Sequence, residues 1–219
     1  MDGDIERPNA DLELELLEIL PGRAQEGGAD LRFVTSLGTL QARFYEAPRP
    51  RVGALWLVEA PVAGGWSELA GRLGRGLAGR GVNSLWLSPR ELGSASEGVV
   101  DAVLGLEFLA AGGADTLRLC GWRRCASSAL AAAALHERAA GVAVVNGGTA
   151  DDGLLERLAP RPLLVVRANG GTDPSGWAAR ELYERAQGPK RLVDLRDASQ
   201  GIEPAGEDLI ELLMSWAAE

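Results

Sequence analysis

Short apolar runs alternate with amphipathic stretches along most of this chain, and this alternation constrains its fold more than any other feature. Six of the runs read as near-continuous apolar strands, and segments with helical periodicity separate most of them. Such strands are buried from both sides, so the pattern predicts a mainly parallel sheet with helices on both faces. The six runs are residues 52–58, 82–87, 117–120, 142–145, 163–166 and 192–195.

The remaining segments complete the expected order. Residues 31–36 and 39–46, joined through Leu37-Gly38, predict an antiparallel hairpin ahead of the parallel strands. This hairpin brings the expected strand count to eight. Helices are expected near residues 66–78, 96–112, 125–139, 174–186 and 204–217.

The first 30 residues differ in charge from the rest of the chain. They hold nine acids and two arginines, a net charge of −7, whereas the other 189 residues carry only −2. We therefore expect an acidic leader, residues 1–30, followed by one domain, residues 31–219. Leu12, Leu16 and Leu20 would share one face of a leader helix that stops at Pro21. The alternation Leu-Glu-Leu-Glu-Leu over residues 12–16 fits an edge strand equally well.

Composition and charge exclude several classes of function. A nearly neutral domain argues against nucleic-acid binding through a basic surface. No apolar run approaches the roughly 20 residues of a membrane span, and the acidic start does not resemble a signal peptide, so a cytoplasmic protein is expected. Cys120 and Cys125 cannot form a disulfide framework. With His136 as the single histidine, the chain lacks the ligands of a His/Cys metal site, and no metal or other cofactor is expected.

Residues 117–130 carry the most specific local pattern. An apolar strand runs into Gly121-Trp122-Arg123-Arg124-Cys125, and an alanine-rich helix follows. A strand, a tight turn and a helix in this order form the elbow that holds a nucleophilic serine as G-x-S-x-G. The small residues at both ends of the motif are present, but its central position is Arg123.

The strand order and this elbow resemble the α/β-hydrolase superfamily over about residues 31–219. Its small members without a lid, such as dienelactone-hydrolase-like proteins and compact esterases, are the most similar. Only a short segment separates Val145 from Leu163, where this family usually inserts a lid, so the resemblance implies a lidless fold. It also implies that nucleophile, acid and histidine follow in this order along the chain.

Each position that the resemblance assigns to catalysis holds an unexpected or ambiguous residue. The nucleophile position is Arg123, and the histidine position is Gln200, whose amide cannot act as a general base. The candidate acid, Asp173, precedes Pro174 and is better interpreted as a helix N-cap. Glu59 stands in the loop that should stabilise an oxyanion, where a carboxylate opposes that chemistry. These substitutions predict a degenerate triad.

Other side chains near the elbow are poor replacements. A register centred on Cys125 would put the bulky Arg123 two residues before the nucleophile, where a small residue is required. Ser127 and Ser128 fall inside the predicted helix, and we interpret them as packing residues. His136 lies about 20 Å along the helix from Arg123, too far to act as its base. A solvated position near the C-terminus of the helix is expected for His136.

Further motifs are interpreted structurally. The G-x-G-x-x-G match at residues 74–79 ends a helix instead of opening one, which favours close helix–sheet packing over dinucleotide binding. Asn-Gly-Gly-Thr occurs at residues 146–149 and 169–172, each time after a predicted strand, and is typical of turns. Of the six tryptophans, three are expected in the core and three near the candidate site: Trp56, Trp86 and Trp216, then Trp66, Trp122 and Trp177.

An arginine at the elbow permits two interpretations. Arg123 could pair with Glu59 or Asp173 and fill the old active-site crevice, which is the more economical hypothesis because an unpaired buried arginine is costly. Alternatively, Arg123 could act with Arg124 and Arg90 to receive a carboxylate or phosphate from a small ligand.

We therefore predict a non-catalytic binding or interaction module on a hydrolase-like fold. The candidate binding residues are Arg123, Trp122, Arg124, Glu59 and Gln200. A protein partner or a second copy of the chain could bind through the acidic leader or an exposed sheet edge. The alternatives are a hydrolase with Cys125 or a nearby serine as nucleophile, and a small-anion-binding protein that uses Arg123.

Overall fold

The computed structural model describes residues 14–25, 27–59, 65–90, 95–168, 174–195 and 207–219. They form a nine-stranded sheet in the order β1-β2-β3-β5-β4-β6-β7-β8-β9. The first three strands and the β3–β5 pair are antiparallel, and the other pairs are parallel. The strands are β1 Leu16–Gln25, β2 Gly28–Thr35, β3 Gly38–Tyr45, β4 Val52–Leu57, β5 Val82–Ser88, β6 Thr116–Trp122, β7 Ala139–Val145, β8 Leu163–Ala168 and β9 Lys190–Leu195.

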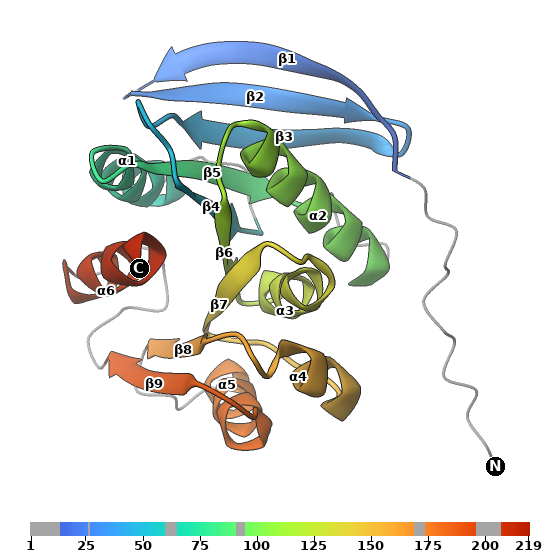
Figure 1. Cartoon of the computed structure of the whole chain (residues 1–219), viewed down its shortest axis with the longest axis vertical. Coiled ribbons are helices and arrows are strands. Elements are labelled where there is room, and N and C mark those ends of the chain that lie inside the picture. Colours follow the sequence, from blue (N-terminus) through green and yellow to red (C-terminus); the bar gives the residue numbers. More distant parts are fainter. Residues whose placement is uncertain (1–13, 26, 60–64, 91–94, 169–173, 196–206) are drawn as a thin grey trace.

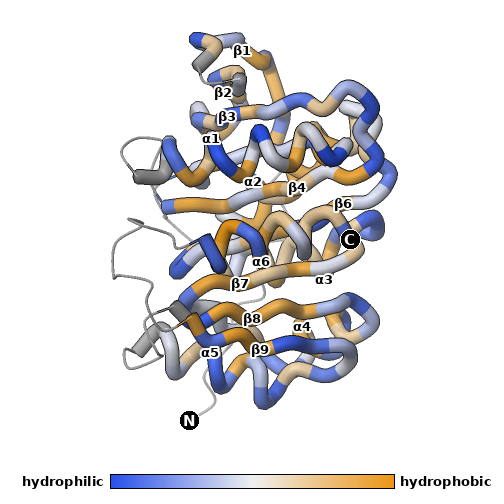
Figure 2. The backbone as a smooth tube through the Cα atoms, turned by 90° about the vertical axis from the view of Figure 1, so that its left-hand side faces the viewer, coloured by the Kyte–Doolittle hydropathy of each residue, from blue (hydrophilic) through white to orange (hydrophobic). Residues whose placement is uncertain are grey.

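Helices cover both faces of this sheet, as predicted (Figure 1). Helices α1 and α6 pack on one face, and α2 to α5 pack on the other. The central strands are apolar along most of their length (Figure 2), and Trp56, Trp86 and Trp216 are buried as expected. The helices are α1 Gly65–Ala78, α2 Ala95–Ala111, α3 Cys125–Leu135, α4 Asp152–Leu158, α5 Pro174–Arg185 and α6 Glu207–Ala218.

The predicted count of eight strands is wrong by one, because the leader contributes β1. This strand pairs with β2 at the edge of the sheet, so Leu16 and Leu20 lie in a strand and not in the alternative helix; the alternation expected over residues 12–16 overlaps the strand only at Leu16. The predicted division at residue 30 falls inside β2. Pro21 lies in this edge strand, next to an irregularity in its pairing with β2, and edge strands and irregularities are the places where sheets accept proline.

Two further features differ from the expectations. The short helix α4 was not predicted; its N-cap is Asp151, whose side chain accepts a hydrogen bond from Leu154 N. His136 lies at the C-terminal end of α3 as predicted, but the expected solvated position is wrong. The ring is buried, and its Nε2 lies 3.1 Å from Glu107 Oε1. Because α2 packs beside α3, Glu107 of α2 covers this helix end.

Two of the three glycines in the G-x-G-x-x-G match, Gly74 and Gly76, permit close packing, as predicted. A Cβ atom at Gly74 would lie 2.3 Å from the ring of Tyr45 on β3. A Cβ atom at Gly76 would lie 2.6 Å from the sulfur of Met214 on α6. Larger residues at these positions would push α1 away from the sheet and from α6.

Candidate functional site

The turn between β6 and α3 has the geometry of a nucleophile elbow. Strand β6 ends at Trp122 and helix α3 begins at Cys125. Between them Arg123 has a φ of 50°, in the left-handed region that non-glycine residues seldom adopt. A Cβ atom at Gly121 would lie only 2.6 Å from the Cα atom of Ala126. The close approach of helix to strand therefore requires a glycine at the start of the motif.

The turn after β7 supports this elbow from the side. Asn146 has a φ of 50° and Gly147 a φ of 157°, which agrees with the predicted turn. A Cβ atom at Gly147 would lie 2.4 Å from the carbonyl oxygen of Arg123, so the two backbones touch. The hydroxyl of Ser127 lies 3.1 Å from that of Thr149 and accepts the Thr149 N–H at 3.0 Å.

Glu59 contacts the elbow, but through Arg124. The backbone N–H of Arg124 donates to Glu59 Oε1 at 2.9 Å, and Arg124 Nε lies 3.4 Å from the same oxygen. The expected pairing of Glu59 with Arg123 is therefore wrong, because Glu59 pairs with the next residue, Arg124. Leu57 on β4 lies opposite Gly121 on β6, so Glu59 reaches the N–H of Arg124, the residue at the N-cap of α3. An anion is favourable there because the helix dipole is positive at its N-terminus.

The three arginines do not form a free cluster. The Arg90 guanidinium is bound to the carboxylate of Asp101, which also accepts the backbone N–H of Arg90 at 3.0 Å. Arg124 is held by Glu59. Arg123 is exposed, and no ion pair joins it to another residue in the described part of the chain. Two of the three predicted anion receptors are thus already occupied by carboxylates.

The alternative nucleophiles are poorly placed. Cys125 is buried, and this burial raises the pKa of its thiol to about 12; Glu59 adds to the shift and Arg124 opposes it. A thiol with so high a pKa holds very little reactive thiolate at neutral pH. Ser128 is buried within α3, and Ser127 is bonded to the neighbouring turn, which agrees with packing roles.

The raised pKa of Cys125 gives a direct prediction. In a Cys120→Ala variant, iodoacetamide at pH 7.5 should alkylate native Cys125 about a thousandfold more slowly than an exposed cysteine. Because the pKa is raised, the rate should increase about tenfold per pH unit between pH 7 and 9. Intact mass against time measures both quantities. The same variant in guanidinium chloride, where the thiol is exposed, is the control. Rapid alkylation of the native protein would show that Cys125 is activated.

The structure brings together four of the predicted site residues: Glu59, Trp122, Arg123 and Arg124. Trp122 is buried beneath the elbow, whereas Trp177 on α5 is 65% exposed. The remaining predicted features lie outside the described residues: Asp173, Gln200, the second Asn-Gly-Gly-Thr copy at residues 169–172 and the side chain of Trp66.

Sequence reasoning missed the contact that organises the elbow. Glu59 was expected to oppose an oxyanion, but its bond to the Arg124 N–H was not foreseen. A signal was present, because Glu59 directly follows a strand that neighbours β6, and parallel strands end at the same edge of a sheet. The second missed contact is the one between Arg90 and Asp101, which joins the end of β5 to α2.

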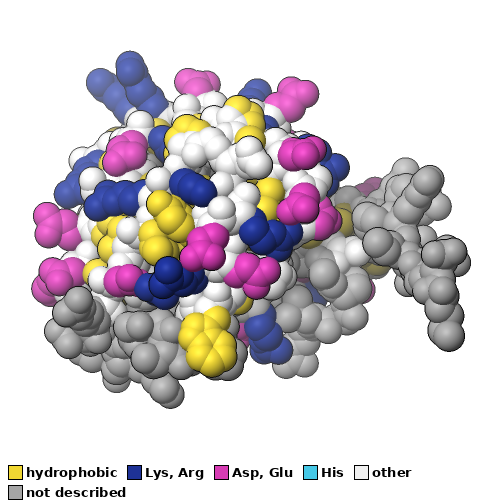
Figure 3. All heavy atoms as spheres, turned by 90° about the horizontal axis from the view of Figure 1, so that it is seen from below, with side chains coloured by type: hydrophobic (Ala, Val, Ile, Leu, Met, Phe, Trp, Pro, Cys, Tyr) yellow, Lys and Arg dark blue, Asp and Glu magenta, His cyan; other side chains and the backbone are white. Residues whose placement is uncertain are grey.

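Metal-ligand groups, membrane-spanning helices and surface charge indicate no additional site among the described residues. Within the described ranges, no group of three His, Cys, Asp or Glu side chains is arranged to hold a metal ion. Among the same residues, no helix is both long and apolar enough to cross a membrane. On the face shown in Figure 3, acidic and basic side chains of the described residues are interspersed.

This chain is similar to known proteins in its structure, but the comparisons of sequence found no match. No protein-family model and no curated protein sequence matches it. A dienelactone hydrolase from Anabaena variabilis is 17% identical with a TM-score of 0.63, over 90% of this chain and 95% of that one. A serine hydrolase homologue from Coxiella burnetii is 15% identical with a TM-score of 0.64, over 86% and 95%. A serine hydrolase without lid from Xanthomonas campestris is 18% identical with a TM-score of 0.55, over 80% and 87%.

Proposed function

We propose that this chain, which has the predicted α/β-hydrolase fold, is a non-catalytic binding module and not a hydrolase. The bond between Glu59 and the Arg124 N–H carries this proposal. In enzymes with this elbow, the N–H that follows the nucleophile helps to stabilise the oxyanion. Arg124 occupies that position here. A carboxylate on its N–H both uses the donor and places negative charge where the oxyanion would develop.

The side chain at the elbow supports the same conclusion. Arg123 has the backbone conformation that presents a nucleophile, yet a guanidinium is permanently charged and has no lone pair available for attack. Cys125 does not replace it, since the thiol is buried with a raised pKa. The elbow thus keeps the shape of a catalytic turn while its described side chains supply neither nucleophile nor oxyanion stabilisation.

The competing proposals are less well supported. A small-anion receptor built from Arg123, Arg124 and Arg90 would need the last two to leave Glu59 and Asp101. A hydrolase with an atypical nucleophile would need Cys125 to ionise despite its surroundings, or Ser127 to leave Thr149. The solved structures named above include a dienelactone hydrolase and serine hydrolases, so residual hydrolysis is the outcome that needs a direct test.

A fluorophosphonate probe provides that test. We expect no adduct by intact mass on the unmodified chain, because such probes react with serines that a nearby base activates. A known serine hydrolase in the same buffer controls for probe quality. An Arg123→Ser, Gln200→His variant returns a hydroxyl and an imidazole to the predicted positions. Labelling of this variant alone would show that only side chains are missing. A stoichiometric adduct on the unmodified chain would overturn the proposal.

A further inference from the structure

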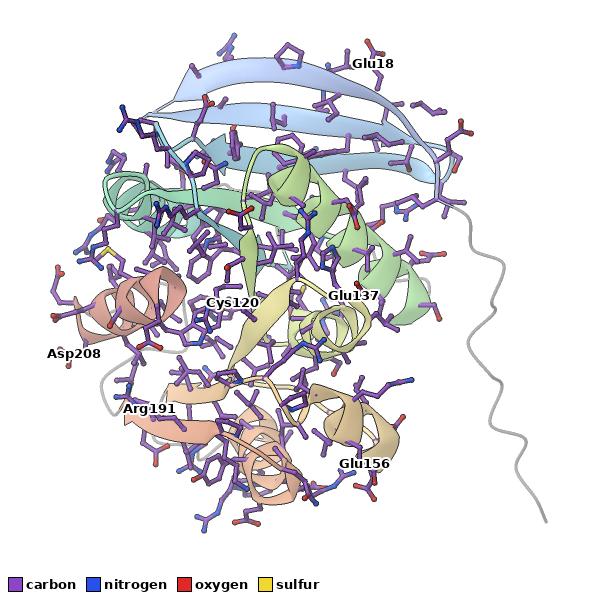
Figure 4. The ribbon with its side chains drawn as sticks, in the orientation of Figure 1. Glu18, Cys120, Glu137, Glu156, Arg191 and Asp208 are labelled. Carbon is purple, nitrogen blue, oxygen red and sulfur yellow. The ribbon has the colours of Figure 1, made fainter. Side chains whose placement is uncertain are left out.

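A second concave site lies far from the elbow. A pocket of about 220 Å³ opens between α6 and the first residues of β8 and β9. Strands β8 and β9 run parallel to β6. The pocket lies where β8 and β9 begin, whereas the elbow lies where β6 ends, so the two sites are at opposite ends of the parallel strands. The wall is partly apolar and partly charged, and Figure 4 labels Arg191 on β9, on the side that carries α6. The lining includes Pro162, Leu164, Arg191, Leu212, Trp216 and Glu219.

Arg118 does not line this pocket but packs behind two residues that do, Pro162 and Trp216. It belongs to β6, two residues before Cys120, which packs in the cluster on the α6 face, so both side chains point to that face. A Cβ atom on the neighbouring Gly141 would lie 2.4 Å from Arg118 Nη1 and 3.3 Å from the Pro162 carbonyl oxygen. The guanidinium therefore fills the space of the missing side chain, beside Pro162. The guanidinium carbon of Arg118, Cζ, lies 5.8 Å from the ring centroid of Trp216.

The donors of these two side chains are incompletely satisfied. Arg118 is 8% exposed, and its Nη1 donates to the carbonyl oxygen of Ala140 at 3.3 Å. Arg118 Nε and Trp216 Nε1 are buried and have no hydrogen-bond partner among the described residues. Burial lowers the pKa of Arg118, and the nearby Glu219 carboxylate opposes this shift. A buried cation with few acceptors is costly, and a ligand that supplies an acceptor would reduce that cost.

The charges around the pocket favour an anion. Arg118 and Arg191 contribute two positive charges, against one negative charge on Glu219. The C-terminus of α6 adds about half a negative charge. Lys190 also lines the pocket, and its ammonium group keeps its positive charge although it bonds to carbonyl oxygens at the end of α5, at 2.7 Å from Ala186 O. The balance of charge around the pocket is therefore positive.

We infer that this pocket binds a small carboxylate attached to a flat apolar group. The carboxylate would lie between Arg118 and Arg191, and the apolar group would contact Leu164 and the part of Trp216 that lines the pocket. Arginine recognises a carboxylate through paired N–H donors, and an aromatic wall favours a planar partner. This site is independent of the elbow, so it does not depend on whether the chain is catalytic.

Benzoate is a suitable probe, because it combines the two features in one small molecule. The six tryptophan indole N–H signals of the ¹⁵N-labelled full chain are observable by NMR, and Trp216→Phe and Trp122→Phe variants assign two of them. We expect benzoate to shift the Trp216 signal saturably with a Kd of about 1 mM, and to leave the Trp122 signal at the elbow unchanged. Sodium chloride at equal ionic strength controls for screening.

Two surface variants give opposite expected effects. Arg191→Gln should weaken benzoate binding about tenfold, and Glu219→Gln should tighten it about threefold, because each removes one charge near the ligand. Arg32→Gln on β2 removes an exposed charge far from the pocket and should change nothing. A Trp216 signal that does not saturate by about 10 mM, or binding insensitive to Arg191→Gln, would overturn the assignment.

Discussion

Replacing Gly121 with alanine should lower the free energy of unfolding by about 3 kcal/mol. The added Cβ atom would lie 2.6 Å from both the Cα atom of Ala126 and the Cβ atom of Ala129, and 2.7 Å from the Cys125 carbonyl oxygen. Two of these atoms belong to the backbone of α3, so a change of rotamer cannot relieve the contact. The helix would have to move away from β6. Urea unfolding followed by circular dichroism measures the loss.

Gly79→Ala is the matched control for this substitution. A Cβ atom at Gly79 would lie 3.7 Å from its nearest neighbours, which is an ordinary contact. This variant should stay within about 0.5 kcal/mol of the unmodified chain. If Gly121→Ala behaved like Gly79→Ala, strand β6 and helix α3 would not approach as closely as the elbow geometry requires, and the comparison of Arg123 with a nucleophile position would lose its basis.

The parallel part of the sheet could be predicted because its signal is strong and local. Each of the six strands is a short apolar run, and such runs are typical of parallel strands that helices bury from both faces. Strand β1 was ambiguous for the opposite reason. Its outer edge has no neighbouring strand among the described residues, so its sequence retains charged residues such as Glu18 and Arg23, and a helical face could be drawn through Leu16 and Leu20. The pairing with β2 decides between the two, and pairing is a long-range property.

The elbow shows where sequence reasoning stops. Gly121 and Cys125 at a fixed spacing indicate a tight turn, and the φ of Arg123 agrees with it. The partner of each charge could not be predicted in the same way. Glu59 and Arg124 are 65 residues apart in sequence, and their contact depends on β4 and β6 being neighbours in register. The sequence suggested that Glu59 would approach the elbow but could not specify which N–H it would reach.

The prediction that His136 is exposed to solvent failed for a related reason. Its place at the end of α3 follows from the sequence, since the alanine-rich segment has to end before the next strand. Its exposure depends on whether another helix covers that end. Helix α2 does so through Glu107, which lies 29 residues away in the chain. The periodicity of α3 describes that helix alone and gives no information on whether α2 packs against its end.

Arg90→Met should be the second variant with a large cost, and it tests whether Arg90 is available to a ligand. Asp101 is fully buried, and its carboxylate accepts from Arg90 Nε at 3.1 Å, from Nη2, and from the backbone N–H at 3.0 Å. Methionine keeps the length of the side chain but leaves the buried carboxylate with the Arg90 backbone N–H as its one donor among the described residues. We expect the free energy of unfolding to fall by about 3 kcal/mol. Arg180→Met, which breaks an exposed ion pair with Glu184, should cost about 0.5 kcal/mol or less.

A double-mutant cycle separates the ion pair from the packing of the two side chains. Asp101→Leu combined with Arg90→Met removes both charges, so the double variant should recover about half of the stability that Arg90→Met loses. Recovery would show that the cost comes from an unpaired buried carboxylate, which means that the charge of Arg90 is committed to Asp101. If Arg90→Met were as stable as the unmodified chain, that charge would be free at the carboxyl edge of the sheet. A receptor for small anions built on Arg123 and Arg90 would then regain support over the module that we propose.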